Sequence, residues 1–518
     1  MSGSVVIDGR KLSAERVVAV MHGAHVELCE EARARVEANA RVASELAPSG
    51  LLERKRRVLV GASQGDPSAD EQVYSSRDFI VAHCAAVGEP LDSRYVRALM
   101  VCRANVLAAG YSGVRPQAVE LLLNMLNAGV HPVVPSQGSV GAAGDLAPLA
   151  HVARVACRYG GTAWRDGEVV DCDVAMEGVP AFEPEGKEAL ALINGATLTV
   201  AMAAAAVHRA KRLLVAAEVA CAMSMEAGLA DLRCLDLDGL RARGHRGAVE
   251  VAEQLQVLLK GSVLSTTDRA PDSFSTRCAP AVLGAALEAI DHVADIVDRE
   301  LNGACDNPLI VGEREVELGN FHGAPIALAM DYLKVALTQV AGISERRVFR
   351  LTYGHLARGL PSFLIEGTGV NSGFMLAQYT SASLVSACKG LAHPGSVDSI
   401  PTIQHHEDHV SMGPISARTC LKLLENVADV IAIEALVAAQ ALDFRKKGVR
   451  FEPSGERVQG PAVALAPGVS EAHAVMRISL EHWESDRVLH PELRAAGRIV
   501  RSGALGSAAG SGLLTAPW

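Results

Sequence analysis

Most of the chain carries apolar residues at three- and four-residue spacing, which is the period of an α-helix. The pattern is clearest in six segments, near residues 91–129, 187–230, 281–301, 323–351, 371–392 and 412–443. These segments are rich in alanine and have few polar positions, which is typical of helices that are buried on several sides in a bundle. The pattern predicts a mainly α fold built around a bundle of long helices.

The first residues follow a shorter period. Residues 5–9 alternate as in a short strand followed by a turn, and Ser13 is a suitable N-cap for the next helix. We therefore expect a small N-terminal lobe that contains both α and β elements. The chain is predicted to divide into an N-terminal lobe at 1–190, a central long-helix bundle at 191–450, and a C-terminal helical segment with a mobile tail at 451–518.

The net charge and the distribution of basic residues limit the kinds of molecule that the protein can be expected to bind. The 518 residues include 59 acidic and 49 basic side chains, which gives a formal net charge of -10. The basic residues form no block of the kind that follows a phosphate backbone. This argues against nucleic acids and anionic membranes as partners. It favours a small-molecule substrate and assembly with copies of the same chain.

The spacing of the cysteines and the character of the first residues indicate in which cellular compartment the protein works. The eleven cysteines are scattered, and they form no CxxC pair and no metal-ligand spacing with histidine. We therefore expect free thiols in a reducing compartment and no metal centre. The first residues contain no apolar run long enough for a signal peptide, and charges interrupt the later alanine-rich stretches. These observations predict a cytoplasmic protein.

Breaks rich in glycine and proline separate the helical segments, at 60–69, 130–148, 266–280, 302–323 and 398–413. Nine short motifs follow one another along the chain from residue 138 onward: GSVGAAGDLAPLAH, LINGA, FSTRC, CDNPL, GNFHG, ISERR, GVNSGFM, AHPGSVDSIPT and EDHVSMG. In this order they resemble the histidine and aromatic amino acid ammonia-lyases, a family of the fumarase/aspartase-like helical superfamily. The resemblance implies a homotetramer of long helices, with each active site formed by loops of three subunits.

The resemblance also implies a prosthetic group that this sequence does not support. The family cyclises an internal Ala-Ser-Gly to an electrophilic methylidene-imidazolone, and the serine hydroxyl leaves as water. The matching tripeptide here is Ala142-Ala143-Gly144. Alanine has no hydroxyl to lose, so the exocyclic methylene cannot form. We expect no methylidene-imidazolone and no other cofactor.

Two catalytic tyrosines of the family are also replaced. Val60 and Phe274 stand at the positions that match them. Ammonia elimination requires removal of a weakly acidic β-proton and expulsion of a poor leaving group, which in the family are the tasks of a phenolate and the electrophile. An engineered serine-to-alanine trap of a normal lyase would retain both tyrosines. That interpretation is therefore disfavoured, and ordinary ammonia elimination is not expected.

The groups that bind substrate in the family are largely retained. Arg277 matches the arginine that holds the substrate carboxylate, and Asn194 matches the asparagine beside the amine. Phe321 matches the aromatic wall, and His83 and Glu407 match groups near the imidazole ring, with His406 and Gln404 as their neighbours. Ala82 stands where the histidine-specific branch often has serine, and it is a candidate for substrate binding together with Val60 and Phe274. This set indicates an amino acid with a polar or cationic ring. Taken singly, Asn194, His83, Arg277 and Glu407 are each also consistent with a structural role.

Two functions therefore remain open. The first is an elimination or isomerisation that needs no electrophile, acting on a carboxylate-bearing imidazole or other polar-ring amino acid derivative. A histidine betaine, which brings its own leaving group, is one example, and the base would be His83, Glu407, His406 or Asp66. The second is an inactive lyase homologue that binds an amino acid-like ligand or a partner subunit.

Overall fold

The computed structural model describes residues 4–46, 75–265, 272–507, 510 and 518. Val60 and Asp66 lie outside the described residues, as does most of the expected C-terminal tail. The chain forms two compact units. The first unit comprises Met1–His208, Val293–Asp331 and Pro394–Arg418, and the second comprises Arg209–His292, Tyr332–His393 and Thr419–Trp518. Four of the five unit boundaries fall within long helices: α10 (Thr197–Ala227), α14 (Ala279–Asn302), α15 (Ala324–Thr352) and α17 (Gly413–Lys446). The fifth, between His393 and Pro394, follows a shorter helix.

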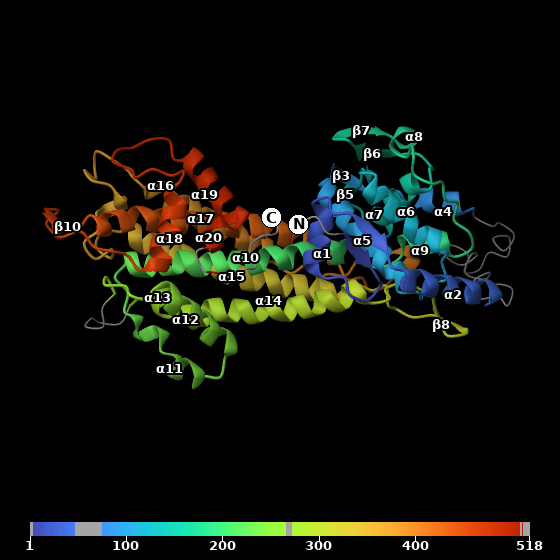
Figure 1. Ribbon diagram of the computed structural model, residues 1–518, viewed down its shortest axis with the longest axis horizontal. Helices are drawn as coiled ribbons and strands as arrows, with labels where there is room; N and C mark the ends of the chain where they lie inside the picture. The colour runs from blue at the N-terminus through green and yellow to red at the C-terminus, as the bar shows by residue number, and fades with distance from the viewer. Residues whose placement is uncertain (1–3, 47–74, 266–271, 508–509, 511–517) are drawn as a thin grey trace. The chain divides into compact units, whose positions relative to one another are not determined.

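The first unit combines helices with small sheets (Figure 1). Its helices are α1 (Ala14–Met21), α2 (Glu30–Leu46), α4 (Ser76–Ala82), α5 (Ser93–Ala108), α6 (Pro116–Asn127), α7 (Leu146–Ala156), α8 (Cys172–Ala175), α9 (Glu188–Ile193) and the 3-10 turn η5 (Ile403–His405). Its strands are β1 (Val5–Ile7), β2 (Val26–Leu28), β3 (Val87–Pro90), β4 (His131–Pro132), β5 (Pro135–Gln137), β6 (Thr162–Arg165), β7 (Glu168–Asp171), β8 (Leu309–Val311) and β9 (Arg314–Val316).

These strands pair locally rather than in one large sheet. β1 and β2 are parallel, whereas the β3–β5, β4–β6–β7 and β8–β9 pairings are antiparallel. The predicted first strand is β1, and the Ser13 side chain accepts a hydrogen bond from the Arg16 backbone at 3.4 Å as the N-cap of α1.

The second unit is built mainly from long helices. Its shorter elements are η3 (Leu232–Leu235), α11 (Leu237–Arg241), α12 (Arg246–Leu258), α13 (Phe274–Arg277), η4 (Ser362–Leu364), α16 (Met375–Leu391), α18 (Pro467–Arg477), α19 (His490–Ser502), α20 (Ala504–Ser507), β10 (Val449–Phe451) and β11 (Arg457–Gln459). α17 runs for 34 residues and α10 for 31, as the helical period predicts. The predicted mainly α fold is confirmed, whereas the three-part division at 190 and 450 stays a prediction.

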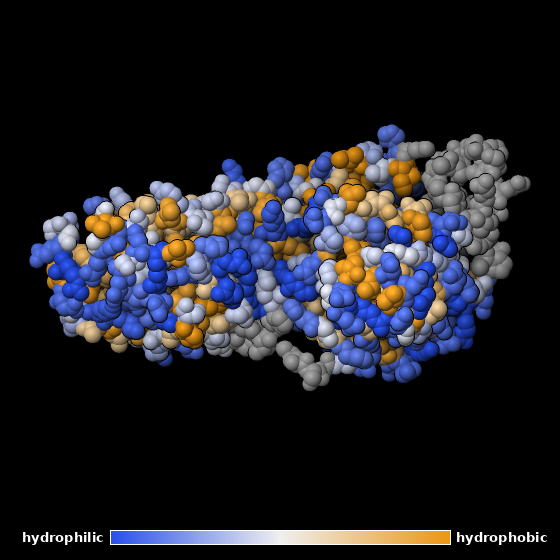
Figure 2. Space-filling view, turned by 90° about the horizontal axis from the view of Figure 1, so that it is seen from above, coloured by the Kyte–Doolittle hydropathy of each residue, from blue (hydrophilic) through white to orange (hydrophobic). Residues whose placement is uncertain are grey.

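Most cysteines and large apolar side chains lie in the interior. All eleven cysteines are free thiols, and most of them are buried. By length and composition alone α15 is apolar enough to cross a membrane, but 61% of its most apolar window is buried inside the protein. A core helix of a soluble protein passes the same test. The face seen in Figure 2 is largely hydrophilic and carries separate patches of apolar residues.

A buried ion pair joins α15 to α17 in the second unit. The Arg347 guanidinium donates to the two Glu434 oxygens at 2.5 and 2.8 Å, and both side chains are almost fully buried. The hydroxyls of Ser224 and Ser344 also donate to Glu434, at 2.7 and 2.5 Å. Each carboxylate oxygen therefore has two donors, so the charges are well compensated.

We predict that Glu434→Gln lowers the free energy of unfolding by about 3–5 kcal/mol, because Arg347 would keep an uncompensated buried charge. Asp238→Asn breaks the exposed Arg241–Asp238 pair and should change that free energy by only about 0–1 kcal/mol. Urea unfolding of both variants measures the two costs. Equal costs would show that the buried pair does not contribute as described.

Candidate active site

A cavity of about 360 Å³ lies in the first unit. Its wall brings together residues that are far apart in the sequence: Phe79, His83, Ala142, Ala143, Leu146, Leu190, Asn194, Asn307, Pro308, Glu317, Leu318, Gly319, Phe321, His322, Ile403, His406, Glu407, Asp408 and His409. The wall combines imidazoles, carboxylates, two side-chain amides and aromatic rings. Cavities with a few convergent polar groups are the usual places for small-molecule binding.

The Ala142-Ala143-Gly144 loop is fixed by contact with Gly195. Gly144 has φ of +79°, and a Cβ atom added there would lie 2.0 Å from the Gly195 carbonyl carbon. The Gly195 amide donates to the Ala143 carbonyl at 3.2 Å, and the Asp145 amide donates to the Gly195 carbonyl at 2.8 Å. Only glycine fits at 144, and its packing leaves Ala143 half-buried in the cavity wall.

Asp145, which follows Gly144, fixes this loop through hydrogen bonds to its side chain. Its carboxylate is fully buried and accepts hydrogen bonds from the Thr199 amide at 2.9 Å and the Ser139 hydroxyl at 3.0 Å. It precedes α7 as the N-cap but makes no side-chain capping bond. Burial raises the pKa of Asp145 to about 6, although the hydrogen bonds from Thr199 and Ser139 oppose this shift.

Asn194 follows α9 and reaches the same cavity. Its residue is only 5% exposed, and the buried Oδ1 atom has no hydrogen-bond partner in the part of the chain that the structure describes. Buried polar atoms are normally paired. Asn194 therefore offers an acceptor for an N–H or O–H group of a ligand.

His83 presents a defined nitrogen to the site. Its Nδ1 lies 2.7 Å from the Phe79 carbonyl, and a carbonyl can only accept, so Nδ1 carries the proton. In the neutral ring Nε2 then keeps a free lone pair. The Phe79 ring packs against the imidazole with 4.5 Å between centroids. His83 can therefore accept a proton or a hydrogen bond through Nε2.

Glu407 is positioned by the loop that contains η5. The Thr402 hydroxyl donates to Glu407 Oε2 at 2.6 Å, and the Thr402 amide donates to the Glu407 carbonyl at 3.0 Å. Glu407 and its neighbour His406 both line the cavity. The side chain of Gln404 lies outside the described residues.

The GNFHG motif supplies Phe321 and His322 to the wall. His322 Nδ1 accepts from the Ala324 amide at 3.3 Å, so Nε2 carries the proton and donates to the His409 carbonyl at 3.2 Å. The rings of His322 and His409 stack with 5.7 Å between centroids. Sequence reasoning missed both histidines as well as Phe79, although His322 belongs to a quoted motif and His409 lies two residues after Glu407.

The other predicted site residues lie elsewhere. Arg277 and Phe274 belong to α13 of the second unit, where both are exposed. Among the described residues the Arg277 side chain makes no hydrogen bond or ion pair, so its guanidinium is available to a ligand. Ala82 is the last residue of α4 and is exposed. The described residues contain no group of three or more side chains able to hold a metal ion.

Residues 12–475 match the family model described as aromatic amino acid lyase. The chain belongs to the aromatic amino acid lyase family. This confirms the resemblance that the nine motifs carry. The first unit, which carries the loop at 142–144, and the second unit of long helices therefore both belong to the fold of this family.

Named relatives of this lyase-family chain match it over nearly their whole length. The histidine ammonia-lyase of Gloeobacter violaceus is 42% identical over 97% of this chain and 96% of its own. The crystal structure of histidine ammonia-lyase from Trypanosoma cruzi has a TM-score of 0.85 at 36% identity, covering 98% of this chain and 95% of that one. The ergothioneine-degrading enzyme ergothionase from Treponema denticola has a TM-score of 0.85 at 25% identity, covering 97% and 99%.

We predict a pH dependence that comes from Asp145 in this lyase fold. Between about pH 4 and about pH 6 the folded state holds a proton that the unfolded state releases, so the free energy of unfolding falls as the pH rises. The fall is on the order of 2–3 kcal/mol. Asp145→Asn should lack this part of the slope, whereas Asp238→Asn should keep it. Urea unfolding between about pH 4 and about pH 6 measures how the free energy of unfolding of each variant depends on pH. The same slope in both variants would contradict the assignment of this dependence to Asp145.

Proposed function

We propose that this chain is a lyase-family enzyme that works without a methylidene-imidazolone group. The observation that carries the proposal is Ala143 in the cavity wall, at the position of the family's serine. None of residues 142–144 has a hydroxyl that could leave as water. The tripeptide therefore does not fit the group, and the reaction has to proceed without an electrophile that activates the amine.

The reaction that fits these groups is an elimination in which the substrate brings its own leaving group. In a trimethylammonium betaine the nitrogen already carries a positive charge. A base removes the β-proton, the electron pair of that C–H bond forms the new C=C bond, and the C–N bond breaks. Its electrons leave with neutral trimethylamine, and the product is an α,β-unsaturated acid. No electrophile is needed, because the quaternary nitrogen has no proton to lose and keeps its positive charge until the C–N bond breaks.

The base is one of four side chains, three of which line the cavity. His83 has the required geometry, because Nδ1 donates to Phe79 and leaves the Nε2 lone pair free. Glu407 and His406 are the other described candidates, and Asp66 remains a candidate outside the described residues. Arg277 of another subunit in the proposed assembly would hold the substrate carboxylate as a bidentate fork, since its guanidinium makes no hydrogen bond or ion pair among the described residues.

Charge and similarity support an imidazole betaine as the substrate class. The carboxylates of Glu317, Glu407 and Asp408 line the cavity beside the rings of Phe79 and Phe321. Carboxylates and aromatic faces both attract a quaternary ammonium. Ergothionase, with its ergothioneine-degrading activity, is similar to this chain over nearly its full length. We therefore propose a carboxylate-bearing imidazole derivative with a quaternary nitrogen.

The proposal is tested with histidine trimethylbetaine, ergothioneine and histidine, by measuring released trimethylamine, released ammonia and the near-ultraviolet absorbance of the acrylate product. We expect trimethylamine from at least one betaine and no ammonia from histidine. Arg277→Ala should lower kcat/KM roughly ten- to hundred-fold through loss of a charged hydrogen-bonding partner.

Arg243→Ala is the matched control, because Arg243 is an exposed arginine of the same unit, and it should leave kcat/KM unchanged. Binding of a betaine without any amine release would favour the alternative of an inactive, ligand-binding homologue. Ammonia release from histidine at a normal lyase rate would overturn the proposal.

We also propose that the chain assembles as a homotetramer in the cytoplasm, where free thiols persist. Large apolar side chains are exposed one helical turn apart on two helices of the second unit: Tyr332 and Val335 on α15, and Leu376 and Tyr379 on α16. Their exposed fractions lie between 47% and 61%. Such surfaces mark protein interfaces.

Light scattering should therefore give about four times the chain mass of 54.3 kDa. Tyr332→Lys and Tyr379→Glu should lower the mass of the assembly, whereas Lys389→Glu, on the same helix as Tyr379, should not. A monomeric wild-type protein would contradict the proposed assembly.

A further inference from the structure

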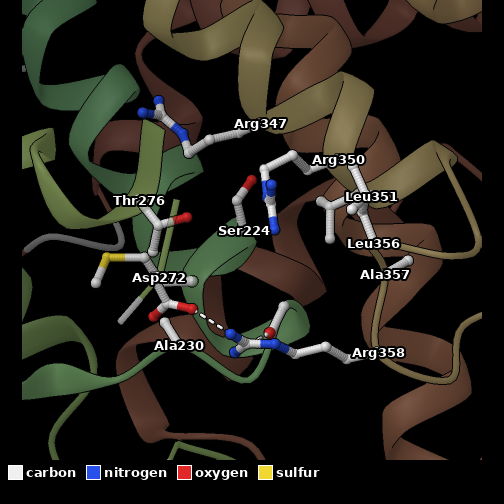
Figure 3. Close-up of a pocket in the computed structure, with 12 residues that line it drawn as sticks. Ser224, Ala230, Asp272, Thr276, Arg347, Arg350, Leu351, Leu356, Ala357 and Arg358 are labelled. Carbon is white, nitrogen blue, oxygen red and sulfur yellow. Dashed lines mark hydrogen bonds and ion pairs between the residues drawn. The ribbon is translucent and has the colours of Figure 1, made fainter. Parts of the chain in front are cut away.

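A second, much smaller cavity lies wholly within the second unit. Its volume is about 30 Å³, which is room for one water-sized group. Three of its lining side chains are arginines, Arg347, Arg350 and Arg358, and they stand beside Ser224, Asp272 and Thr276 (Figure 3). None of these residues lines the cavity of the first unit.

Two of the three arginines are neutralised by carboxylates. Arg347 is bound by Glu434, as described above. Arg358 forms an ion pair with Asp272 and also donates to the carbonyls of Gly228 and Leu229, at 3.1 and 2.5 Å. Figure 3 shows the Arg358 guanidinium turned toward Asp272 and that of Arg347 at the edge of the group.

Arg350 is the third arginine, and it has no such partner. Its side chain makes no hydrogen bond or ion pair with any residue that the structure describes. Figure 3 shows it pointing into the middle of the lining residues. Burial, and then the neighbouring Arg358, lower the pKa of the Arg350 guanidinium. Asp272, which is already paired with Arg358, acts on this pKa in the opposite direction. A guanidinium stays protonated, so the three arginines of the cavity exceed the two carboxylates paired with them by one positive charge.

We propose that this cavity is a binding site for one small monovalent anion of the size of chloride, held by Arg350. The charges fit, because three arginines face the two carboxylates of Asp272 and Glu434, which leaves one positive charge. The volume fits, because it admits a single small ion. The hydroxyl of Thr276 makes no hydrogen bond within the described chain, and it supplies a second donor.

The small cavity is lined by Thr276, the residue that precedes Arg277. Thr276 precedes Arg277 in α13, and Arg347 donates to the Ser275 carbonyl of the same turn at 3.2 Å. Asp272, just before the turn, is held by Arg358 and by the Asp231 amide at 2.6 Å. A bound anion would join Arg350 to Thr276 and so fix the direction in which Arg277 leaves the turn. This link rests on the role proposed for Arg277, whereas anion binding does not.

The test compares thermal unfolding in sodium chloride and in sodium gluconate at equal ionic strength, because gluconate is too large for the cavity. We expect a chloride-specific rise in Tm that saturates. Arg350→Gln should abolish the rise. Arg346→Gln, which removes an exposed arginine of the same helix paired with Glu345, should retain it. Equal Tm in the two salts, or an unchanged chloride response in Arg350→Gln, would overturn the site.

Two further measurements keep the result independent of folding and of the proposed reaction. Wild-type crystals grown in bromide should show an anomalous peak beside Arg350, and its absence at saturating bromide would count against the site even if Arg350→Gln failed to fold. Chloride should also lower KM for a betaine substrate in the wild type but not in Arg350→Gln. A change of Tm without a change of KM would support the anion site and overturn its link to Arg277.

Discussion

The contact between Gly144 and Gly195 is the constraint on which the candidate site depends. The two backbones approach so closely that a Cβ on Gly144 would overlap the Gly195 carbonyl carbon. This contact brings the loop at 142–144 against the residue that follows Asn194, and the buried Asp145 carboxylate fixes it further through Thr199. The loop is therefore held in place by backbone packing, without any contribution from the side chain at 143. Loss of the serine hydroxyl consequently leaves the cavity wall intact.

The proposed elimination follows from the side chains that line this cavity. Among the described residues the cavity offers an imidazole whose Nδ1 donates to the Phe79 carbonyl, three carboxylates and a buried amide oxygen without a hydrogen-bond partner. These groups can remove a proton and stabilise a cation, but they contain nothing that makes an amine a better leaving group. A substrate whose nitrogen is already quaternary removes that need. In the proposed reaction the substrate therefore supplies an activated leaving group, and the protein removes the proton.

The helical period and local cap chemistry were sufficient to predict much of the fold. The long helices α14, α15 and α17 match the periodic segments closely, and Ser13 caps α1 as its side chain suggests. The segments 187–230 and 91–129 are each divided between two helices, α9 and α10 in the first and α5 and α6 in the second. The two compact units were not predictable, because each is assembled from three segments that are separated in the sequence. Periodicity reports which face of a helix is buried, but it does not report which distant segment covers that face.

The candidate site was predictable to a similar extent. Of the residues that motif resemblance selected, Ala142, Ala143, Asn194, Phe321, His83, His406 and Glu407 line one cavity, whereas Gly144, Ala82, Phe274 and Arg277 do not. It did not select Phe79 or His409, which enter the wall through a helical turn and a loop fold rather than through a residue pattern. Arg350 was missed for a different reason. Arg350 stands out because its guanidinium makes no hydrogen bond or ion pair among the described residues. The partners of a guanidinium depend on the fold and cannot be inferred from sequence spacing.

The central claim is that the loop at 142–144 remains an ordinary peptide while the cavity around it is preserved. The most direct measurement is the mass of the proteolytic fragment that contains Ala142-Ala143-Gly144. The account predicts a mass equal to the sum of its residues, with no new near-ultraviolet absorbance in the intact protein. A fragment lighter by one or more waters would show that the loop has cyclised, and it would contradict the account.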